Sequence, residues 1–302
     1  MKHFLVIIAG PTAVGKTALA VQLAKHYGTG VISADARQFY KEMQIGTARP
    51  DEAELEGVPH DFLGHLSIHD TYNVGQFEKD AVHALDDLFR EHQVVFMAGG
   101  SGLYINAVCH GVDEFEEIPA DIRTMIEEQY KNRGLIYLQE QVSQLDPVYY
   151  AHADTQNPQR LKRALEVCLH TGKPYSSFRT QHKKERPFEI IPILVNMDRQ
   201  DLYKRIDRRV DLMMEAGLLK EAESLYPYRS LNALNTVGYK ELFAYFDGAC
   251  SLTDAVAMIK QNTRRYAKRQ LTWFNNQGDY ETFGPGDTDK IKAYIDIIIQ
   301  NQ

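Results

Sequence analysis

The sequence predicts an α/β fold in which helices cover both faces of a parallel sheet. Phe4–Ala9 is a continuous apolar run that ends in glycine, which is typical of a strand buried on both faces. Val94–Ala98 and Glu189–Asn196 repeat this pattern, and helical stretches lie between the runs. Because strands that alternate with helices form parallel sheets, we expect ligands at the carboxyl ends of the strands.

The first strand leads directly into a phosphate-binding loop. Residues 10–17 match the pattern G-x-x-x-x-G-K-[ST], and a helix is predicted from Thr17 to Tyr27, so the fold class is P-loop NTPase-like. Its glycines let backbone amides turn around a diphosphate, and the helix N-terminus adds the positive end of its dipole. Lys16 supplies a cation, and the Thr17 hydroxyl is placed to bind Mg²⁺. The predicted diphosphate-binding residues are Gly10, Pro11, Thr12, Ala13, Val14, Gly15, Lys16 and Thr17.

Two polar side chains are predicted to lie at the same edge of the sheet. Asp35 ends a second short strand, Gly30–Asp35, and could bind a metal, accept a proton or cap a turn. Ser101 lies in the glycine-rich segment Gly99–Gly102, whose glycines could equally serve packing. No aspartate ends Val94–Ala98, so the acidic metal ligand usual in P-loop ATPases is missing there. This loop therefore need not serve ATP.

The strand pattern stops in the middle of the chain. From about Phe115 to Pro187 the sequence is helical in period and rich in Tyr, Gln, Arg and Lys. We therefore expect a helical insertion domain at residues 115–187, between core segments 1–114 and 188–302.

Three further helices are predicted in the core, at Phe77–His92, Arg199–Tyr226 and about Thr253–Phe274. Arg205 and Arg209 are four residues apart, so they share one face of the second of these helices. Helical period also places Trp273 and Phe274 in the core rather than against a nucleobase.

The charge of the chain is unevenly distributed. The net charge is −7, yet residues 157–188 carry eight basic and two acidic side chains, and residues 260–270 carry five basic side chains and no acid. Two basic islands on an acidic protein can form a local phosphate-binding surface, although solvated helix faces would give the same pattern. The three cysteines form no Cys-x-x-Cys pair, and no apolar run approaches the length of a membrane span, so a cytoplasmic protein is expected.

Seven separated motifs together resemble the tRNA dimethylallyltransferase family. The resemblance extends from about residue 4 to residue 275, and its motifs keep the order and spacing of the family. They are Gly10–Thr17, Ser33–Gln38, Gly99–Tyr104, Asn157–Ala164, Arg205–Val210, Val237–Lys240 and Lys268–Phe274. Two positions differ, because Ala36 replaces the usual Ser and Ser101 replaces the usual Thr.

The resemblance implies transfer of a dimethylallyl group from dimethylallyl diphosphate to N6 of the adenosine 3′-adjacent to the anticodon, with Mg²⁺ as cofactor. It implies that Asp35 is the general base, and that Arg209 and Ser101 act at the reacting centre. The anticodon stem-loop of tRNA is the implied partner, and Asn235–Lys240 falls at positions that the family uses for tRNA. The other tRNA-binding positions implied are Asp35, Ala36, Arg37, Gln38, Ser101, Arg123, Gln159, Arg160, Leu161, Lys162 and Arg163.

Two rival functions fit parts of the sequence. A P-loop kinase using ATP is the default for an isolated motif of this kind, but the missing strand-end aspartate and the basic insertion disfavour it. An RNA-binding protein with a vestigial loop is disfavoured by the intact Lys16, Thr17 and Asp35. We expect no membrane association, and a monomer, because no apolar stripe is evident.

Overall fold

The computed structural model describes residues 2–113, 118–179, 184–277 and 280–301. The chain divides into two compact units, which we call the core unit (Met1–His110 with Glu185–Gln302) and the insertion unit (Gly111–Lys184). Each unit is described by itself. The sequence predicts the insertion at residues 115–187, so each predicted bound lies three or four residues from the bound of the insertion unit.

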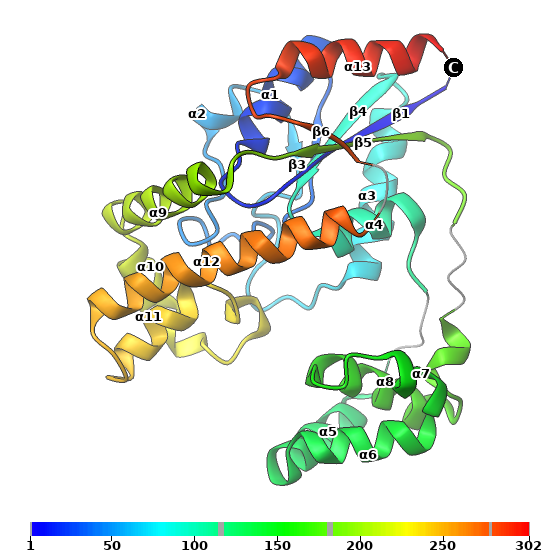
Figure 1. The fold of residues 1–302 in the computed structure, drawn as a ribbon, viewed down its shortest axis with the longest axis vertical. Coiled ribbons are helices and arrows are strands. Elements are labelled where there is room, and N and C mark those ends of the chain that lie inside the picture. Colours follow the sequence, from blue (N-terminus) through cyan, green and yellow to red (C-terminus); the bar gives the residue numbers. More distant parts are fainter. Residues whose placement is uncertain (1, 114–117, 180–183, 278–279, 302) are drawn as a thin grey trace. The chain divides into compact units, whose positions relative to one another are not determined.

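A six-stranded sheet forms the centre of the core unit (Figure 1). The order is β3-β2-β4-β1-β5-β6, and every neighbouring pair is parallel. The strands are β1 Phe4–Ala9, β2 Val31–Ser33, β3 His60–Asp61, β4 Val94–Gly99, β5 Glu189–Val195 and β6 Glu281–Phe283. The predicted parallel α/β sheet is confirmed. The edge strands β3 and β6 were not predicted, because each is two or three residues long and lacks an apolar run.

Both faces of this sheet are covered by helices. On one face the side chains of Phe4, Val6 and Ile8 pack with α1 (Lys16–Tyr27) and α13 (Thr288–Gln300). On the other face Leu5 and Ile7 pack with α3 (Val74–Leu88) and α4 (Gly102–His110). Figure 1 shows these pairs of helices on opposite sides of the strands. Because alternate side chains of β1 enter two different cores, the strand must be apolar throughout.

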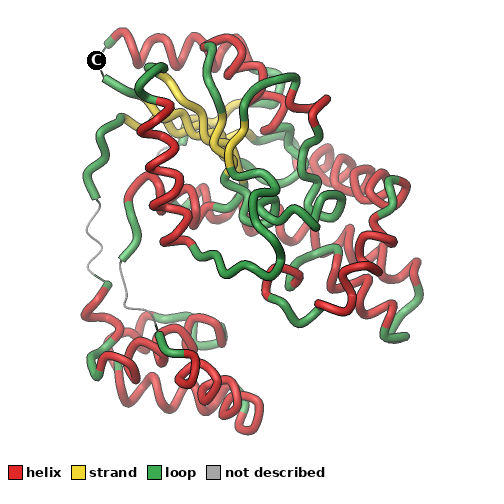
Figure 2. The backbone as a smooth tube through the Cα atoms, turned by 180° about the vertical axis from the view of Figure 1, so that it is seen from behind, coloured by secondary structure: helices red, strands yellow, loops and turns green. Residues whose placement is uncertain are grey.

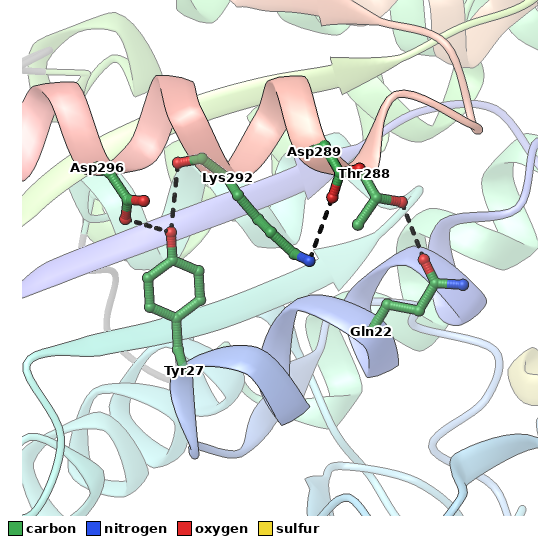
Figure 3. Close-up of polar contacts among 6 residues, drawn as sticks. All are labelled: Gln22, Tyr27, Thr288, Asp289, Lys292 and Asp296. Carbon is green, nitrogen blue, oxygen red and sulfur yellow. Dashed lines mark hydrogen bonds and ion pairs between the residues drawn. The ribbon is translucent and has the colours of Figure 1, made fainter.

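Polar contacts attach the C-terminal helix to the helix that follows the phosphate-binding loop (Figure 3). The phenol of Tyr27 on α1 donates to the Asp296 carboxylate of α13 at 2.8 Å. At the other end of the same pair, the Thr288 hydroxyl donates to the Gln22 side chain at 2.9 Å. These contacts join residues more than 260 positions apart in the sequence and hold α1 against α13.

The predicted long helix over residues 199–226 is wrong, because the structure contains two helices there. These are α9 (Arg199–Glu215) and α10 (Leu218–Leu225). Gly217 lies between them with a φ of 104°, a left-handed value that ends a helix and that side chains other than glycine rarely adopt. After this change of direction, Leu218, Ala222 and Leu225 of α10 pack in a third apolar cluster. Apolar residues continue at helical spacing on both sides of Gly217, so the spacing alone does not reveal the break.

Helix α12 (Leu252–Asn275) links the three apolar clusters of the core unit. Its first half packs with α10 and α11 (Tyr239–Phe246) through Ala255 and Ile259. Its last turns pack under the sheet, where Phe274 is buried as predicted and Trp273 is partly buried against the same cluster. Figure 1 shows this helix running beside α9 and then below the strands. The short helix α2 (Glu52–Leu55) completes the helices before α3.

The described part of the insertion unit is helical, and Figure 2 shows no strand in it. Its helices are α5 Ala120–Arg133, α6 Leu135–Leu145, α7 Pro147–His152 and α8 Pro158–Thr171. They enclose a separate apolar core that includes Ile126, Leu138 and Leu161. The fully buried carboxylate of Asp146 accepts hydrogen bonds from the backbone of Tyr149 and Ser176. It therefore connects the start of α7 to the segment that follows α8.

None of the helices in the described part of the chain is long and apolar enough to cross a bilayer. All three cysteines are free thiols, and Cys109 and Cys168 are buried while Cys250 is partly exposed.

Replacing Tyr27 with phenylalanine is expected to lower the free energy of unfolding by about 1 kcal/mol, because the variant loses its hydrogen bond to Asp296. Urea titration measures this difference, with Tyr228→Phe as a control because that side chain is 44% exposed. Equal free energies of unfolding for the two variants would mean that the hydrogen bond between Tyr27 and Asp296 contributes nothing to stability.

Candidate active site

The phosphate-binding loop connects β1 to α1 in a conformation that requires its glycines. A side chain on Gly10 would place Cβ 2.5 Å from the carbonyl oxygen of Val195, and Gly15 has a φ of 109°. The loop therefore packs directly against the end of β5 before it enters the helix. Within the loop, the Lys16 ammonium donates to the carbonyl of Pro11 at 2.8 Å. This contact holds the ammonium inside the turn, where an anion would lie.

Three arginines of α9 lie around this loop. Arg209 donates to the Thr12 hydroxyl at 3.3 Å, and the Arg205 guanidinium lies against Gly15. Both arginines and Arg208 line one cavity with the loop, so the predicted shared face of Arg205 and Arg209 is confirmed. Arg208 was not singled out from the sequence, although it lies within the motif Arg205–Val210 and three residues after Arg205 on the same face.

Burial in this site changes the acidity of Lys16. Burial lowers the pKa of its ammonium to about 8; the Asp35 carboxylate opposes this shift and Arg209 adds to it. Burial also lowers the pKa of Arg209, again opposed by Asp35. The site thus holds two desolvated cations whose charged forms a bound anion would stabilise.

Asp35 lies two residues beyond the end of β2, between two cavities. The first, of about 520 Å³, is lined by Lys16, Thr17 and the arginines of α9. The second, of about 460 Å³, is lined by Ala36, Ser101 and Asn235–Gly238 with Lys240. The residues that line both cavities are Thr12, Asp35, Thr47, Ala48 and Arg209. A group in either cavity can therefore reach the same carboxylate.

Ser101 follows β4 and faces the second cavity. Its hydroxyl oxygen accepts a hydrogen bond from the backbone N–H of Ala36 at 3.1 Å, and its own N–H donates to the carbonyl of Ala34. The segment after β4 is thereby attached to the segment that carries Asp35. A side chain on Gly99 would place Cβ 2.2 Å from the carbonyl oxygen of Ala34, so this close approach requires glycine.

Sequence reasoning missed Gln270 of α12 as a positioning residue. Its buried side-chain amide accepts from the N–H of Thr12 and donates to the carbonyl of Gly100, both at 2.9 Å. One side chain therefore fixes the phosphate-binding loop relative to the loop that carries Ser101. The sequence does contain a sign of this role. Gln270 is polar, yet it lies at helical spacing from Ala267 and Phe274, which places it on the buried face of the helix.

The side chains of Arg37 and Gln38 make contacts within the core unit. Arg37 donates to the carbonyls of Asn232 and Ala233, and Gln38 donates to those of Thr47 and Ala48. Arg37 thereby lines the second cavity, and Gln38 lines the first.

The six predicted tRNA-binding residues of the insertion unit differ in their surroundings. Arg123, Gln159 and Arg160 are exposed, and the first two line a hollow of about 400 Å³. Arg163 is partly exposed and pairs with Glu166 at 3.4 Å. Leu161 is fully buried, so its side chain serves the apolar core.

Lys162 is also buried, and it pairs with Glu127 while lying 3.9 Å from the centre of the Tyr130 ring. Its ammonium is therefore part of the insertion unit's own packing. Of the same basic island, Lys183 lies outside the described residues.

The predicted metal ligand, Thr17, lines the first cavity. Among the described residues no group of three or more His, Cys, Asp or Glu side chains could form a metal cage. Mg²⁺ does not require such a cage, because it keeps several waters and binds substrate phosphates with one or two protein oxygens. The Thr17 hydroxyl beside a diphosphate pocket therefore fits a magnesium ion.

A model of the IPP transferase family matches residues 38–277 of this chain. Among curated relatives, the tRNA dimethylallyltransferase of Christiangramia forsetii is 52% identical over 94% of both chains. The tRNA dimethylallyltransferase 1 of Bacteroides fragilis is 46% identical over 98% of both.

Solved structures agree with these relatives. The full-length tRNA isopentenylpyrophosphate transferase of Bacillus halodurans aligns with a TM-score of 0.71 and 36% identity, over 100% of this chain and 96% of its own. A eukaryotic dimethylallyltransferase acting on tRNA aligns with a TM-score of 0.83 and 26% identity, over 99% of this chain and 80% of its own.

Pyrophosphate binding is expected to be coupled to proton uptake by Lys16. Its pKa is about 8 without ligand, and the anion raises this pKa, so binding above pH 8 adds a proton to Lys16 and weakens as pH rises. Calorimetry in buffers of different ionisation enthalpy measures the uptake.

The matched variant is Lys16→Arg, which keeps the charge but does not titrate in this range. Since protonation of pyrophosphate itself is the same in both experiments, the difference between the proteins isolates Lys16. Identical uptake by the two proteins would show that Lys16 is fully charged before the ligand binds.

Proposed function

The chain belongs to the IPP transferase family, and on that basis we propose that its two joined cavities transfer a dimethylallyl group from dimethylallyl diphosphate to N6 of a tRNA adenosine. The acceptor is the adenosine 3′-adjacent to the anticodon. In the reaction the bond between C1 and the bridging oxygen breaks, the bond between N6 and C1 forms, one N6 proton leaves, and diphosphate is released. The observation that carries the proposal is the position of Asp35, whose carboxylate faces both cavities.

The first cavity suits the diphosphate of the donor. Breaking an allylic C–O bond builds positive charge on carbon and negative charge on the departing oxygens. Lys16, Arg209 and the amides of the loop are held in place before the ligand arrives, so they stabilise the leaving group more than the ground state. Thr17 would hold Mg²⁺ against the diphosphate, where the ion neutralises part of its charge.

The second cavity suits the acceptor. The exocyclic amine of adenine is a weak nucleophile, because its lone pair is delocalised into the ring. A carboxylate that accepts a hydrogen bond from N6–H orients the amine and takes its proton as the new bond forms. Asp35 is available for this role. One of its oxygens accepts from the N–H of Arg37 at 3.1 Å, and the other has no hydrogen-bond partner among the described residues.

The insertion unit supplies phosphate contacts to the tRNA in this proposal. Arg123 and Arg160 are exposed cations on helices α5 and α8. A loop adenosine can leave its stack at a cost of a few kcal/mol, which contacts to the backbone offset. We expect the chain to act as a monomer in the cytoplasm, where its tRNA substrate is found.

The test uses unmodified tRNA, Mg²⁺ and labelled dimethylallyl diphosphate, with labelled ATP as the alternative donor. Label that enters tRNA from the prenyl donor alone supports the proposal. ATP turnover without prenyl transfer would instead indicate a kinase, and tRNA binding without either reaction would indicate a binding protein.

Replacing Asp35 with asparagine is expected to lower kcat by about 100-fold or more, because the amide cannot take the proton from N6. Binding of tRNA should change little, since the variant keeps the size of the side chain and its amide oxygen can still accept from N6–H. Single-turnover transfer and filter binding measure the two effects. Retained turnover would remove Asp35 from its role as base.

Replacing Arg160 with glutamate is expected to weaken tRNA binding, and to lower the slope of log K against log salt by about 1. Arg90→Glu, a charge reversal at an exposed arginine of the core unit, is the control. Lys162→Glu should instead destabilise the insertion unit, because it places a carboxylate at a buried position beside Glu127, its former partner. An unchanged salt slope for Arg160→Glu would exclude a phosphate contact there.

A further inference from the structure

Helix α12 places a tyrosine in the second cavity that neither the sequence motifs nor the reaction scheme accounts for. Tyr266 lines this cavity together with Asp35 and Ser101. It lies one turn before Gln270, whose two hydrogen bonds fix α12 against both the phosphate-binding loop and Gly100. The phenol is therefore presented to the cavity by a rigid part of the structure.

The hydrogen bonds around Ser101 leave the phenol proton of Tyr266 available. The Ser101 oxygen already accepts from the N–H of Ala36. The Ser101 hydroxyl interacts with the phenol and lowers its pKa. Because the Ser101 oxygen already accepts one hydrogen bond, its own proton can be directed at the phenol oxygen. Within the described ranges the phenol has no side-chain or carbonyl partner besides Ser101. Since partly buried phenols normally find an acceptor, a bound ligand is the natural partner.

The phenol keeps its proton under any condition in which the protein would be assayed. Burial raises the pKa of Tyr266 to about 12, and the nearby Asp35 charge also raises it, while Arg37 and Arg269 act in the opposite direction. The second cavity thus offers a fixed donor on α12 and a fixed acceptor after β2.

This pair of groups matches the amino edge of adenine. The N6 amine is a donor, and ring nitrogens that accept hydrogen bonds, N1 and N7, lie on either side of it. Guanine has a carbonyl oxygen at the same position, which would face the Asp35 carboxylate without a proton between them. A donor beside an acceptor therefore distinguishes the two purines.

We propose that Tyr266 is a substrate-binding residue that determines specificity, and that its phenol donates a hydrogen bond to a ring nitrogen beside the reacting amine while Asp35 accepts from N6–H. This inference rests on the proposed function. Ser101 then acts on the base through Tyr266, as a positioning residue that orients the phenol.

The experiment compares the unmodified protein with Tyr266→Phe on three anticodon stem-loop RNAs. These carry adenosine, 1-deazaadenosine or 7-deazaadenosine at the reactive position, so each analogue lacks one ring nitrogen. With adenosine, Tyr266→Phe should lower kcat/KM about 10-fold, because one hydrogen bond to the base is lost. On one of the two analogues, kcat/KM of the unmodified protein should fall by a similar factor relative to adenosine. On that same analogue, kcat/KM of the variant should equal its value with adenosine.

The outcomes separate this inference from the proposed function. Equal penalties on both analogues for both proteins would overturn the role of Tyr266 while leaving the transfer reaction intact. No transfer to adenosine by the unmodified protein would overturn both. Tyr245→Phe, which removes a phenol that lines neither cavity, should react like the unmodified protein on all three RNAs. A merely structural role for Tyr266 would lower all three rates of the variant alike and would show no dependence on the ring nitrogen.

Discussion

Parallel strands all end at the same edge of their sheet, and neighbours in the order β2-β4-β1 bring three separate segments together there. The phosphate-binding loop follows β1, Asp35 follows β2, and Ser101 follows β4. Their spacing is set by backbone pairing, since Ala34 donates its N–H to Ala98 and accepts from Ser101. The position of Asp35 between the two cavities follows from this constraint, and the proposed chemistry requires it.

Two helices from the second half of the chain complete this edge. Arg209 of α9 donates to the hydroxyl of Thr12, and Gln270 of α12 accepts from the N–H of the same residue. Thr12 is thus held from two directions by residues nearly 200 or more positions away, and it lies on the wall that the cavities share. Such a fixed junction matters for a reaction in which an amine and an allylic carbon must meet within a narrow range of distances.

The electrostatics of the first cavity are arranged before any ligand binds. Burial lowers the pKa of both Lys16 and Arg209, and the Asp35 carboxylate opposes both shifts only in part. In the proposed reaction a diphosphate in this cavity would stabilise the charged forms of both side chains. The net charge of the whole chain is −7, so polyanions are attracted only where cations cluster locally. Such clusters include the arginines of α9 and the exposed arginines of α5 and α8.

The sequence by itself determined the parallel sheet, the phosphate-binding loop and the family, because buried strands, glycine spacing and ordered motifs are local patterns. It also predicts Asp35 and Arg209 as site residues, but only the resemblance raises Asp35 above other strand-end carboxylates. Only the tertiary structure decided the break at Gly217, the burial of Leu161 and Lys162, and the contacts made by Gln270 and Tyr266. Those properties depend on which helix face meets which partner across hundreds of residues, and hydrophobic period along one segment carries no information about its distant neighbours.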